Sequence, residues 1–186
     1  MHRQALLTKL AAYTPLDGPE RRAYERMVAF VRANPACFER LLLAGHVTAS
    51  AWLLDRSGDR VLLTHHKQLG RWLQLGGHAD GNGDVLSVAL REAQEESGLS
   101  TITPVSTDIF DVDVHPIPAH RDMPTHEHYD VRFLLQTHGD EKYRVSDESH
   151  ELAWVSPSKL PALNVDESVQ RLHRKWLDRR GASLRT

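Results

Sequence analysis

A glycine-rich loop that runs directly into a carboxylate-rich helix is the feature that most constrains this chain. The stretch "LQLGGHADGNGDVLSVALREAQEESGLS" spans residues 73–100, and "GGHADGNGD" within it contains four glycines in nine residues. Glycine allows the backbone to approach a ligand closely. The sequence predicts a helix over about residues 84–97, because Asp84 can cap its first turn and Gly98 suits a left-handed stop after its last. Loop and helix are therefore expected to build one site.

Three glutamates of this helix, Glu92, Glu95 and Glu96, stand at positions i, i+3 and i+4 and so project from one face. Each like-charge pair costs about 0.2–0.5 kcal/mol when unscreened, and carboxylates near a helix C-terminus also oppose the macrodipole. Arg91 offsets part of this cost but cannot pair with three carboxylates. A divalent cation can, because clustered carboxylate oxygens are the ligands that Mg²⁺ and Mn²⁺ prefer. A solvated acidic face is the alternative, and the adjoining glycine loop favours the metal site.

The same segment resembles the signature of the Nudix hydrolases, G-x5-E-x7-R-E-U-x-E-E-x-G-U, in which U is an apolar residue. Counted from Gly77, the remaining positions that match are Arg91, Glu92, Ala93, Glu95, Glu96, Gly98 and Leu99. One position departs from the pattern, since the glutamate expected after the first x5 falls on Gly83. Either the neighbouring Asp84 serves in its place or a supporting carboxylate has been lost.

The resemblance implies an enzyme that hydrolyses a nucleoside diphosphate linked to another moiety, with Mg²⁺ or Mn²⁺ as cofactor. It implies that Glu92 and Glu96 are metal ligands, that Glu95 contributes as ligand or as base, and that Gly76 offers its backbone carbonyl to a metal. Arg91 resembles the residue that orients a carboxylate through a bidentate pair. The chemistry agrees, because attack on an anionic pyrophosphate needs neutralised charge and activated water, and metal ions supply both.

Residues outside the signature supply a candidate base and candidate substrate contacts. "SDESHELAWV" offers Glu148 as a general base, with Glu151 close by, and the alternative is that both are solvated surface carboxylates. The residues that we expect to contact the substrate surround the glycine loop and are His66, Arg71, Trp72 and His78. Packing is the alternative for His66 and for the tryptophans, because aromatic residues in strands are usually core residues.

A second group of histidines lies in "HPIPAHRDMPTHEHYD" and comprises His115, His120, His126 and His128. His126-x-His128 could form a ligand pair for a transition metal if the backbone is extended. The other interpretation is a flexible, polar loop between two strands on the substrate side. Three prolines and the lack of a cysteine partner favour the loop.

The organisation of the chain indicates an α+β fold. Residues 1–43 show amphipathic helical patterns, including a short third helix at "CFERLLL", and predict an N-terminal helical extension. Residues 44–186 then alternate strands and helices without regular βαβ repeats, which favours a mixed sheet flanked by helices. The predicted strands, the first two of which should form a hairpin, are "HVTASAWLLD", "VLLTHH", "DIFDVDVH", "HYDVRFLLQT" and "ELAWV". An amphipathic helix closes the chain, and the resemblance implies an α/β/α sandwich of the Nudix type for this second domain.

Composition excludes several other classes of protein. The formal net charge of −2 gives no reason to expect DNA or an anionic membrane as a partner. No apolar run approaches the roughly 20 residues of a membrane span. Cys37 is the only cysteine, so an intrachain disulfide is excluded and a reducing cytoplasm is expected. The expected partner is a small-molecule nucleotide or other diphosphate, and the N-terminal helices could cover a face of the sheet or a partner subunit in a homo-oligomer.

Two alternative functions share the resemblance. A Nudix domain can bind a nucleotide as a sensor without turnover, but such domains commonly lack the catalytic glutamates that this sequence retains, and only Gly83 favours the sensor. Isopentenyl diphosphate isomerases rely on a cysteine near the site, whereas Cys37 lies in the N-terminal helical region. The hydrolase is the favoured prediction.

Overall fold

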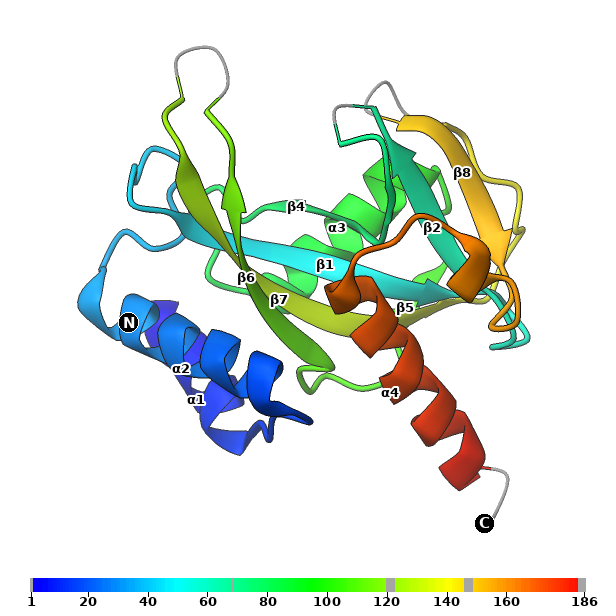
Figure 1. The fold of residues 1–186 in the computed structure, drawn as a ribbon, viewed down its shortest axis with the longest axis horizontal. Coiled ribbons are helices and arrows are strands. Elements are labelled where there is room, and N and C mark those ends of the chain that lie inside the picture. Colours follow the sequence, from blue (N-terminus) through cyan, green and yellow to red (C-terminus); the bar gives the residue numbers. More distant parts are fainter. Residues whose placement is uncertain (1, 68, 120–122, 146–148, 184–186) are drawn as a thin grey trace.

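The protein is an α+β structure with one mixed, curled sheet, as the sequence predicts (Figure 1). The computed structural model describes residues 2–67, 69–119, 123–145 and 149–183. The helices are α1 (His2–Ala12), α2 (Gly18–Ala33), α3 (Val85–Ser97), the 3-10 helix η1 (Leu160–Ala162) and α4 (Glu167–Ser183). The strands are β1 (His46–Leu54), β2 (Val61–His66), β3 (Trp72–Leu73), β4 (Leu75–His78), β5 (Ile102–Pro104), β6 (Asp111–Ile117), β7 (His126–Thr137) and β8 (Ser149–Val155). Among the described residues, no helix is both long and apolar enough to cross a bilayer.

Strand β1 lies at the centre of the sheet and is buried along its whole length. It pairs in parallel with β7 from His46–His128 to Leu54–Gln136, and it pairs antiparallel with β4. The predicted hairpin with β2 is present, but only two residue pairs join β1 to β2, whereas β2 pairs with β8 from Val61 to His66. A strand that is covered on both faces does not need the alternation of apolar and polar residues that a half-exposed strand shows.

One face of the sheet is apolar and packs on α3. Its odd-numbered side chains from β1, including Val47, Ala49 and Ala51, share a core with Val88 and Ala89 of α3. Helix α3 begins and ends where the sequence predicts: the Asp84 side chain accepts a hydrogen bond from the Ser87 amide at 3.3 Å, and Gly98 adopts the left-handed conformation with a φ of 70°. Capping and apolar packing therefore place α3 against β1 and β4.

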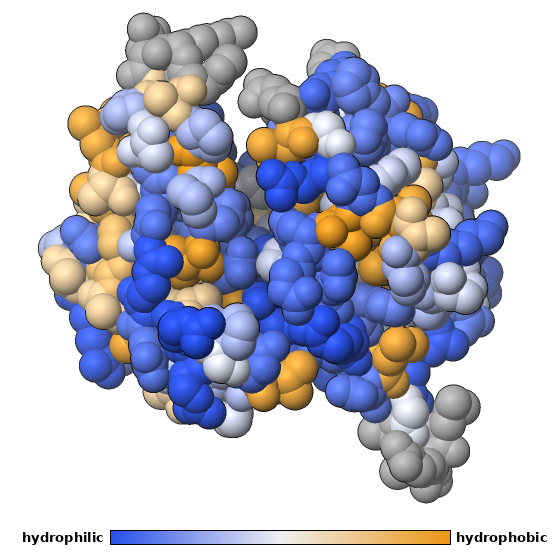
Figure 2. Space-filling model, viewed as in Figure 1, coloured by the Kyte–Doolittle hydropathy of each residue, from blue (hydrophilic) through white to orange (hydrophobic). Residues whose placement is uncertain are grey.

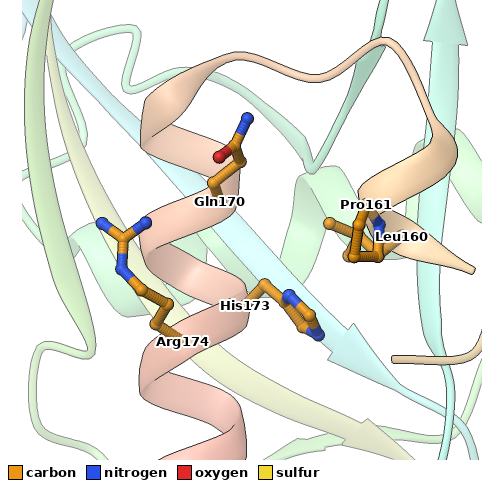
Figure 3. A pocket seen from close by; sticks show the side chains of 5 residues that line it. All are labelled: Leu160, Pro161, Gln170, His173 and Arg174. Carbon is orange, nitrogen blue, oxygen red and sulfur yellow. The ribbon is translucent and has the colours of Figure 1, made fainter. Parts of the chain in front are cut away.

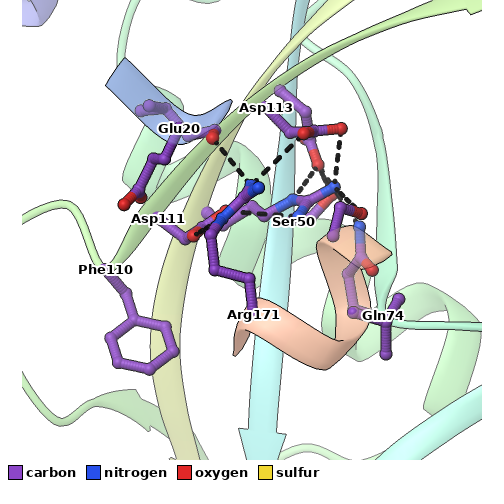
Figure 4. A network of polar contacts seen from close by, with 12 residues as sticks. Glu20, Ser50, Gln74, Phe110, Asp111, Asp113 and Arg171 are labelled. Carbon is purple, nitrogen blue, oxygen red and sulfur yellow. Dashed lines mark hydrogen bonds and ion pairs between the residues drawn. The ribbon is translucent and has the colours of Figure 1, made fainter. Parts of the chain in front are cut away.

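The opposite face is polar over one half of its length and apolar over the other. The apolar half packs on α4, where Trp52 of β1 meets Trp176. The polar half consists of side chains that share this face of β1, β6 and β7, and we call it the polar layer: His46, Thr48, Ser50, Asp111, Asp113, His115, His128, Asp130 and Arg132. Figure 4 shows how its charged end joins to Arg171 of α4 and to Glu20 of α2. Lys175 completes this buried network by pairing with both Asp111 and Glu20.

Helices α1 and α2 share the main hydrophobic core with the sheet. Leu6 and Leu10 of α1 are fully buried, and Phe30 of α2 stacks on Tyr129 of β7 with ring centroids 3.9 Å apart. These contacts bury the apolar stripes of both helices within the molecule. In space-filling view the face that carries α4 is largely hydrophilic, with hydrophobic side chains in separate groups (Figure 2).

Two predictions from the sequence are wrong. The segment "CFERLLL" forms turns rather than a third N-terminal helix, and Cys37 is buried in it. The part of the histidine segment expected to be a loop is shorter than predicted, because β6 extends to Ile117 and β7 begins at His126, with His115 directly opposite His128. Its prolines misled the prediction: Pro116 is accommodated in β6, which among the described residues pairs only with β7, since an edge strand tolerates a missing amide donor. His120 lies outside the described residues.

Candidate active site

The carboxylates of α3 meet the backbone of β4 at the glycine loop. The Gly76 amide donates a hydrogen bond to Oε1 of Glu96 at 2.7 Å, across twenty residues of sequence. Next to it, a Cβ atom added to Gly77 would overlap the carboxylate of Glu92. Glycine at position 77 therefore leaves the space in which the Glu92 carboxylate lies, and only 14% of the Glu92 side chain is exposed.

Gly76 is confined on its other side by β1. A Cβ atom there would lie 2.7 Å from Cα of Ser50 and would overlap the Ser50 hydroxyl. Any larger residue at position 76 would thus push β4 away from β1 or from Glu96. Both glycines are explained by close approach of the backbone rather than by an unusual φ angle.

Arg91 ties the helix to the strand. Its Nη1 lies 2.8 Å from Oε1 of Glu92 and 3.2 Å from Oε2 of Glu95, while Nη2 donates to the carbonyl oxygen of His78 at 2.9 Å. The expected bidentate pair with one carboxylate is not the geometry observed, because one nitrogen is shared by two carboxylates and the other holds β4. The guanidinium therefore positions the carboxylates relative to the glycine loop.

Glu95 is the most exposed of the three carboxylates, with 59% of its side chain exposed. Glu92, Glu95 and Glu96 thus come from one turn and a half of α3 but differ in environment, with two held against glycine backbone and one facing solvent. This arrangement supplies carboxylate oxygens at the edge of a backbone cradle, which is a donor set that hard divalent cations accept.

Gly83, the departure from the signature, lies against the start of α1. A Cβ atom at this position would be 3.0 Å from both Cβ and the carbonyl oxygen of His2. A glutamate here would require the first turn of α1 to shift, so the N-terminal helix occupies the space beside this position. Asp84 caps α3, and its hydrogen bond with the Ser87 amide explains why an aspartate stands at this position.

The remaining candidates lie on other elements. His66 ends β2, and its Nδ1 accepts a hydrogen bond from the Leu69 amide at 3.3 Å. The Arg71 guanidinium pairs with Asp166 at 3.3 Å, and Trp72 packs against the second core, beside His65. His78 follows the cradle glycines in β4.

The structure describes one of the two candidate bases. Glu148 lies outside the described residues. Glu151 is exposed in β8 opposite His65 of β2, which agrees with the solvated alternative for this carboxylate.

A surface pocket of about 260 Å³ lies between η1 and α4 (Figure 3). It is lined by Leu160, Pro161, Gln170, His173 and Arg174. None of these residues belongs to the glycine loop or to the carboxylate group, and the pocket lacks the acidic lining that a metal-dependent site needs. The geometry of the carboxylates, not this hollow, locates the candidate active site.

Part of the polar layer supports β4, and the sequence did not predict this role. Asp130 accepts hydrogen bonds from Thr48 at 3.0 Å and from Ser50 at 2.8 Å, and Gln74 reaches the same carboxylate at 3.3 Å. This buried acid therefore fixes the side chain that packs against Gly76. The signal was available in "HYDVRFLLQT", where Asp130 and Arg132 are charged residues inside a strand that is otherwise apolar.

Comparisons with known proteins identify a family for this architecture. A family model described as NUDIX domain matches residues 44–179, whereas no curated protein matches the sequence. A C. elegans Ap4A hydrolase in a binary complex superposes with a TM-score of 0.59 at 17% identity, covering 73% of this chain and 98% of that one. The MutT protein of Methanosarcina mazei Go1 gives a TM-score of 0.58 at 20% identity, covering 76% and 98% of the two chains. A NUDIX-family hydrolase from Clostridium perfringens gives 0.53 at 27% identity, with 70% and 95% coverage.

Proposed function

Because the chain belongs to the Nudix family of pyrophosphohydrolases, we propose that it cleaves the pyrophosphate of a nucleoside diphosphate linked to another moiety. We further propose that the reaction depends on Mg²⁺ or Mn²⁺. The observation that carries the proposal is the contact between two glutamates of α3 and two glycines of β4. Glu96 accepts from the Gly76 amide, and the Glu92 carboxylate fills the space that a side chain at Gly77 would take.

The donor set fits a hard divalent cation. Glu92 and Glu96 would bind it, Glu95 would serve as ligand or as base, and the Gly76 carbonyl lies in the same cradle. When bound, such an ion neutralises phosphate charge and lowers the pKa of a bound water. Three carboxylates within one turn and a half also repel one another, so cation binding here reduces this repulsion and stabilises the folded chain.

The residues of the chain have distinct roles in this proposal. Arg91 fixes Glu92 and Glu95 relative to β4, because its two terminal nitrogens reach both carboxylates and the His78 carbonyl. Glu95 faces solvent, where it can accept a proton from attacking water. His66, Arg71, Trp72 and His78 remain our candidates for substrate contact, and Glu148 remains a candidate base.

The two alternative functions are less well supported. A sensor without turnover has no need of three retained glutamates, and the space at Gly83 is taken by α1 rather than left for a lost carboxylate. An isomerase that uses a cysteine would require an accessible thiol. Cys37 is fully buried, and burial raises the pKa of its thiol to about 11, so the thiolate is scarce at neutral pH.

The substrate is best identified by a panel. Nucleoside triphosphates, dinucleoside polyphosphates, nucleotide sugars and coenzyme-like diphosphates all present a pyrophosphate to the same cradle. The C. elegans neighbour is an Ap4A hydrolase, but identity of 17% relates the two folds alone. Each compound should be incubated with Mg²⁺ and with Mn²⁺, and each product identified by mass.

Three variants test the assignment of the carboxylates. Glu92→Gln and Glu96→Gln should each lower kcat by at least about 100-fold on the best substrate, because each removes a charge that binds the cation. Glu25→Gln on the exposed side of α2 is the matched control and should leave kcat unchanged. Wild-type turnover by Glu96→Gln at saturating Mg²⁺, with folding verified by circular dichroism, would exclude the metal site.

A further inference from the structure

Three histidines, one buried and two partly buried, form a cluster at one end of the polar layer, beside the glycine loop. His46 of β1, His78 of β4 and His128 of β7 each offer a ring nitrogen, and these atoms all lie within 4.8 Å of one another. The three ring centroids are 4.9–5.0 Å apart in every pair. Three strands therefore deliver one imidazole each to the same point.

Three ring nitrogens of this cluster, on His46 and His128, are buried without a hydrogen bond of normal geometry. His46 is 1% exposed, and neither its Nδ1 nor its Nε2 makes such a bond among the described residues, although the Leu42 backbone interacts with the ring. Nε2 of His128 is likewise buried without a hydrogen-bond partner among the described residues. A buried polar atom without a partner destabilises the folded state, so three such atoms at one point need an explanation. A metal ion bound through one nitrogen of each ring would satisfy one nitrogen of His46 and one of His128.

Two more histidines are held at the rim of the cluster. The His126 ring lies 5.0 Å from that of His46, and its Nδ1 bonds to the carbonyl oxygen of Pro124 at 2.8 Å. The His115 ring lies 5.7 Å from that of His128, and its Nδ1 bonds to Asp113 at 3.0 Å. Bonds from one ring nitrogen to a carbonyl or carboxylate orient histidines around metal sites.

The protonation states also suit ligation, which requires neutral imidazole. Burial lowers the pKa of His46 to about 4, and burial together with the neighbouring histidines lowers the pKa of His128 to about 2. Both shifts favour the neutral imidazole that binds a metal ion. The cluster is thus a set of nitrogen donors, whereas the carboxylate cradle is a set of oxygen donors.

We propose that His46, His78 and His128 bind one transition-metal ion of the Zn²⁺ class, at a site separate from the carboxylates of α3. Zn²⁺ accepts three histidines with a fourth, open position, and imidazole suits it better than it suits Mg²⁺. The ion would join β1, β4 and β7. Because the carbonyl oxygen of His78 also accepts a hydrogen bond from Arg91, the ion would hold the glycine loop in place. This inference rests on the histidines alone and does not require the proposed function.

The test measures metal binding directly. Metal-free protein should be titrated with Zn²⁺ in excess Mg²⁺, with stoichiometry from elemental analysis, and with Co²⁺ to read the absorption of the coordinated ion. We expect one Zn²⁺ per chain and a Co²⁺ spectrum of low coordination number. Glu96→Gln should retain this binding even if its hydrolysis is lost, so that failure of the proposed function and failure of the histidine site are distinguishable.

Two variants and one control decide between a metal site and a packing role. His46→Leu and His128→Leu should each weaken Zn²⁺ binding by at least about 100-fold, since losing even an orienting partner typically costs 10–100-fold. Metal-free His46→Leu should have a Tm equal to or above that of metal-free wild type, because it removes two unpartnered nitrogens. His150→Gln, exposed in β8, should bind as wild type does. Absence of stoichiometric Zn²⁺, or unchanged affinity in both leucine variants, would overturn the proposal.

Discussion

Replacement of Arg171 by methionine should expose how the polar layer is held together. From α4, the Arg171 guanidinium makes three hydrogen bonds to carboxylates of β6, two to Asp111 at 2.8 and 2.9 Å and one to Asp113 at 3.2 Å. A fourth bond reaches the Val112 carbonyl at 3.0 Å. Methionine keeps the apolar stem but removes the charge, so Asp111 and Asp113 lose the guanidinium that joins them to α4.

The expected loss of unfolding free energy depends on the contacts that Asp111 keeps in Arg171→Met. Each bond to a charged group contributes about 1.5–3 kcal/mol, and three of them would sum to more than the effect that we expect. Asp111 keeps Arg132 at 3.2 Å and Lys175 at 3.0 Å, which limits the loss. Breaking a buried ion pair on one side typically costs about 3–5 kcal/mol, and we expect Arg171→Met to fall in this range. For a chain of this size, that loss lowers Tm by roughly 6–20 °C.

The assay is urea denaturation of metal-free protein, followed by circular dichroism and tryptophan fluorescence. Arg174→Met is the matched control on the same helix, because Arg174 is 45% exposed and pairs with the exposed Glu167. An exposed pair contributes about 0–1 kcal/mol, so the control should lose no more than that. Equal losses in the two variants would refute the reasoning. A double-mutant cycle with Asp111→Asn should return a coupling energy of at least about 1 kcal/mol.

Three further predictions test the cradle, the N-terminal helices and the acid response. Gly77→Ala should lower Mn²⁺ affinity in calorimetric titration by at least about tenfold, because its Cβ takes the space of the Glu92 carboxylate, and unchanged affinity would contradict the cradle. Leu10→Ala should cost about 2–5 kcal/mol of unfolding free energy, whereas Leu16→Ala at an exposed position should cost less than about 0.5 kcal/mol. Burial raises the pKa of Asp113, but Arg132, His115 and Arg171 together lower it by more, so the folded pKa lies below the unfolded value of about 3.9. Its contribution to stability is therefore complete above about pH 5 and is lost as pH falls toward the folded pKa, and Asp113→Asn should flatten the loss of stability measured by urea denaturation across this range.

The sequence by itself determined the elements whose signals are local. The cap at Asp84, the stop at Gly98 and the spacing of the glutamates act within a few residues, and the structure reproduces α3 as predicted. The alternation in "DIFDVDVH" and "HYDVRFLLQT" likewise predicted β6 and β7. These features depend on helix and strand geometry alone, so no knowledge of distant partners was needed.

Only the tertiary structure decided which of these elements meet. Thr48 and Asp130 are 82 residues apart in the chain, yet the parallel pairing of β1 with β7 joins them in one hydrogen bond. The same pairing places His46 opposite His128, and the pairing of β6 with β7 extends both strands into the segment that was expected to be a loop. Period-two alternation fixes which side chains share a face of one strand, but register between strands depends on contacts along the whole sheet. The carboxylate site was therefore predictable from one helix, whereas the histidine site required three strands to be placed side by side.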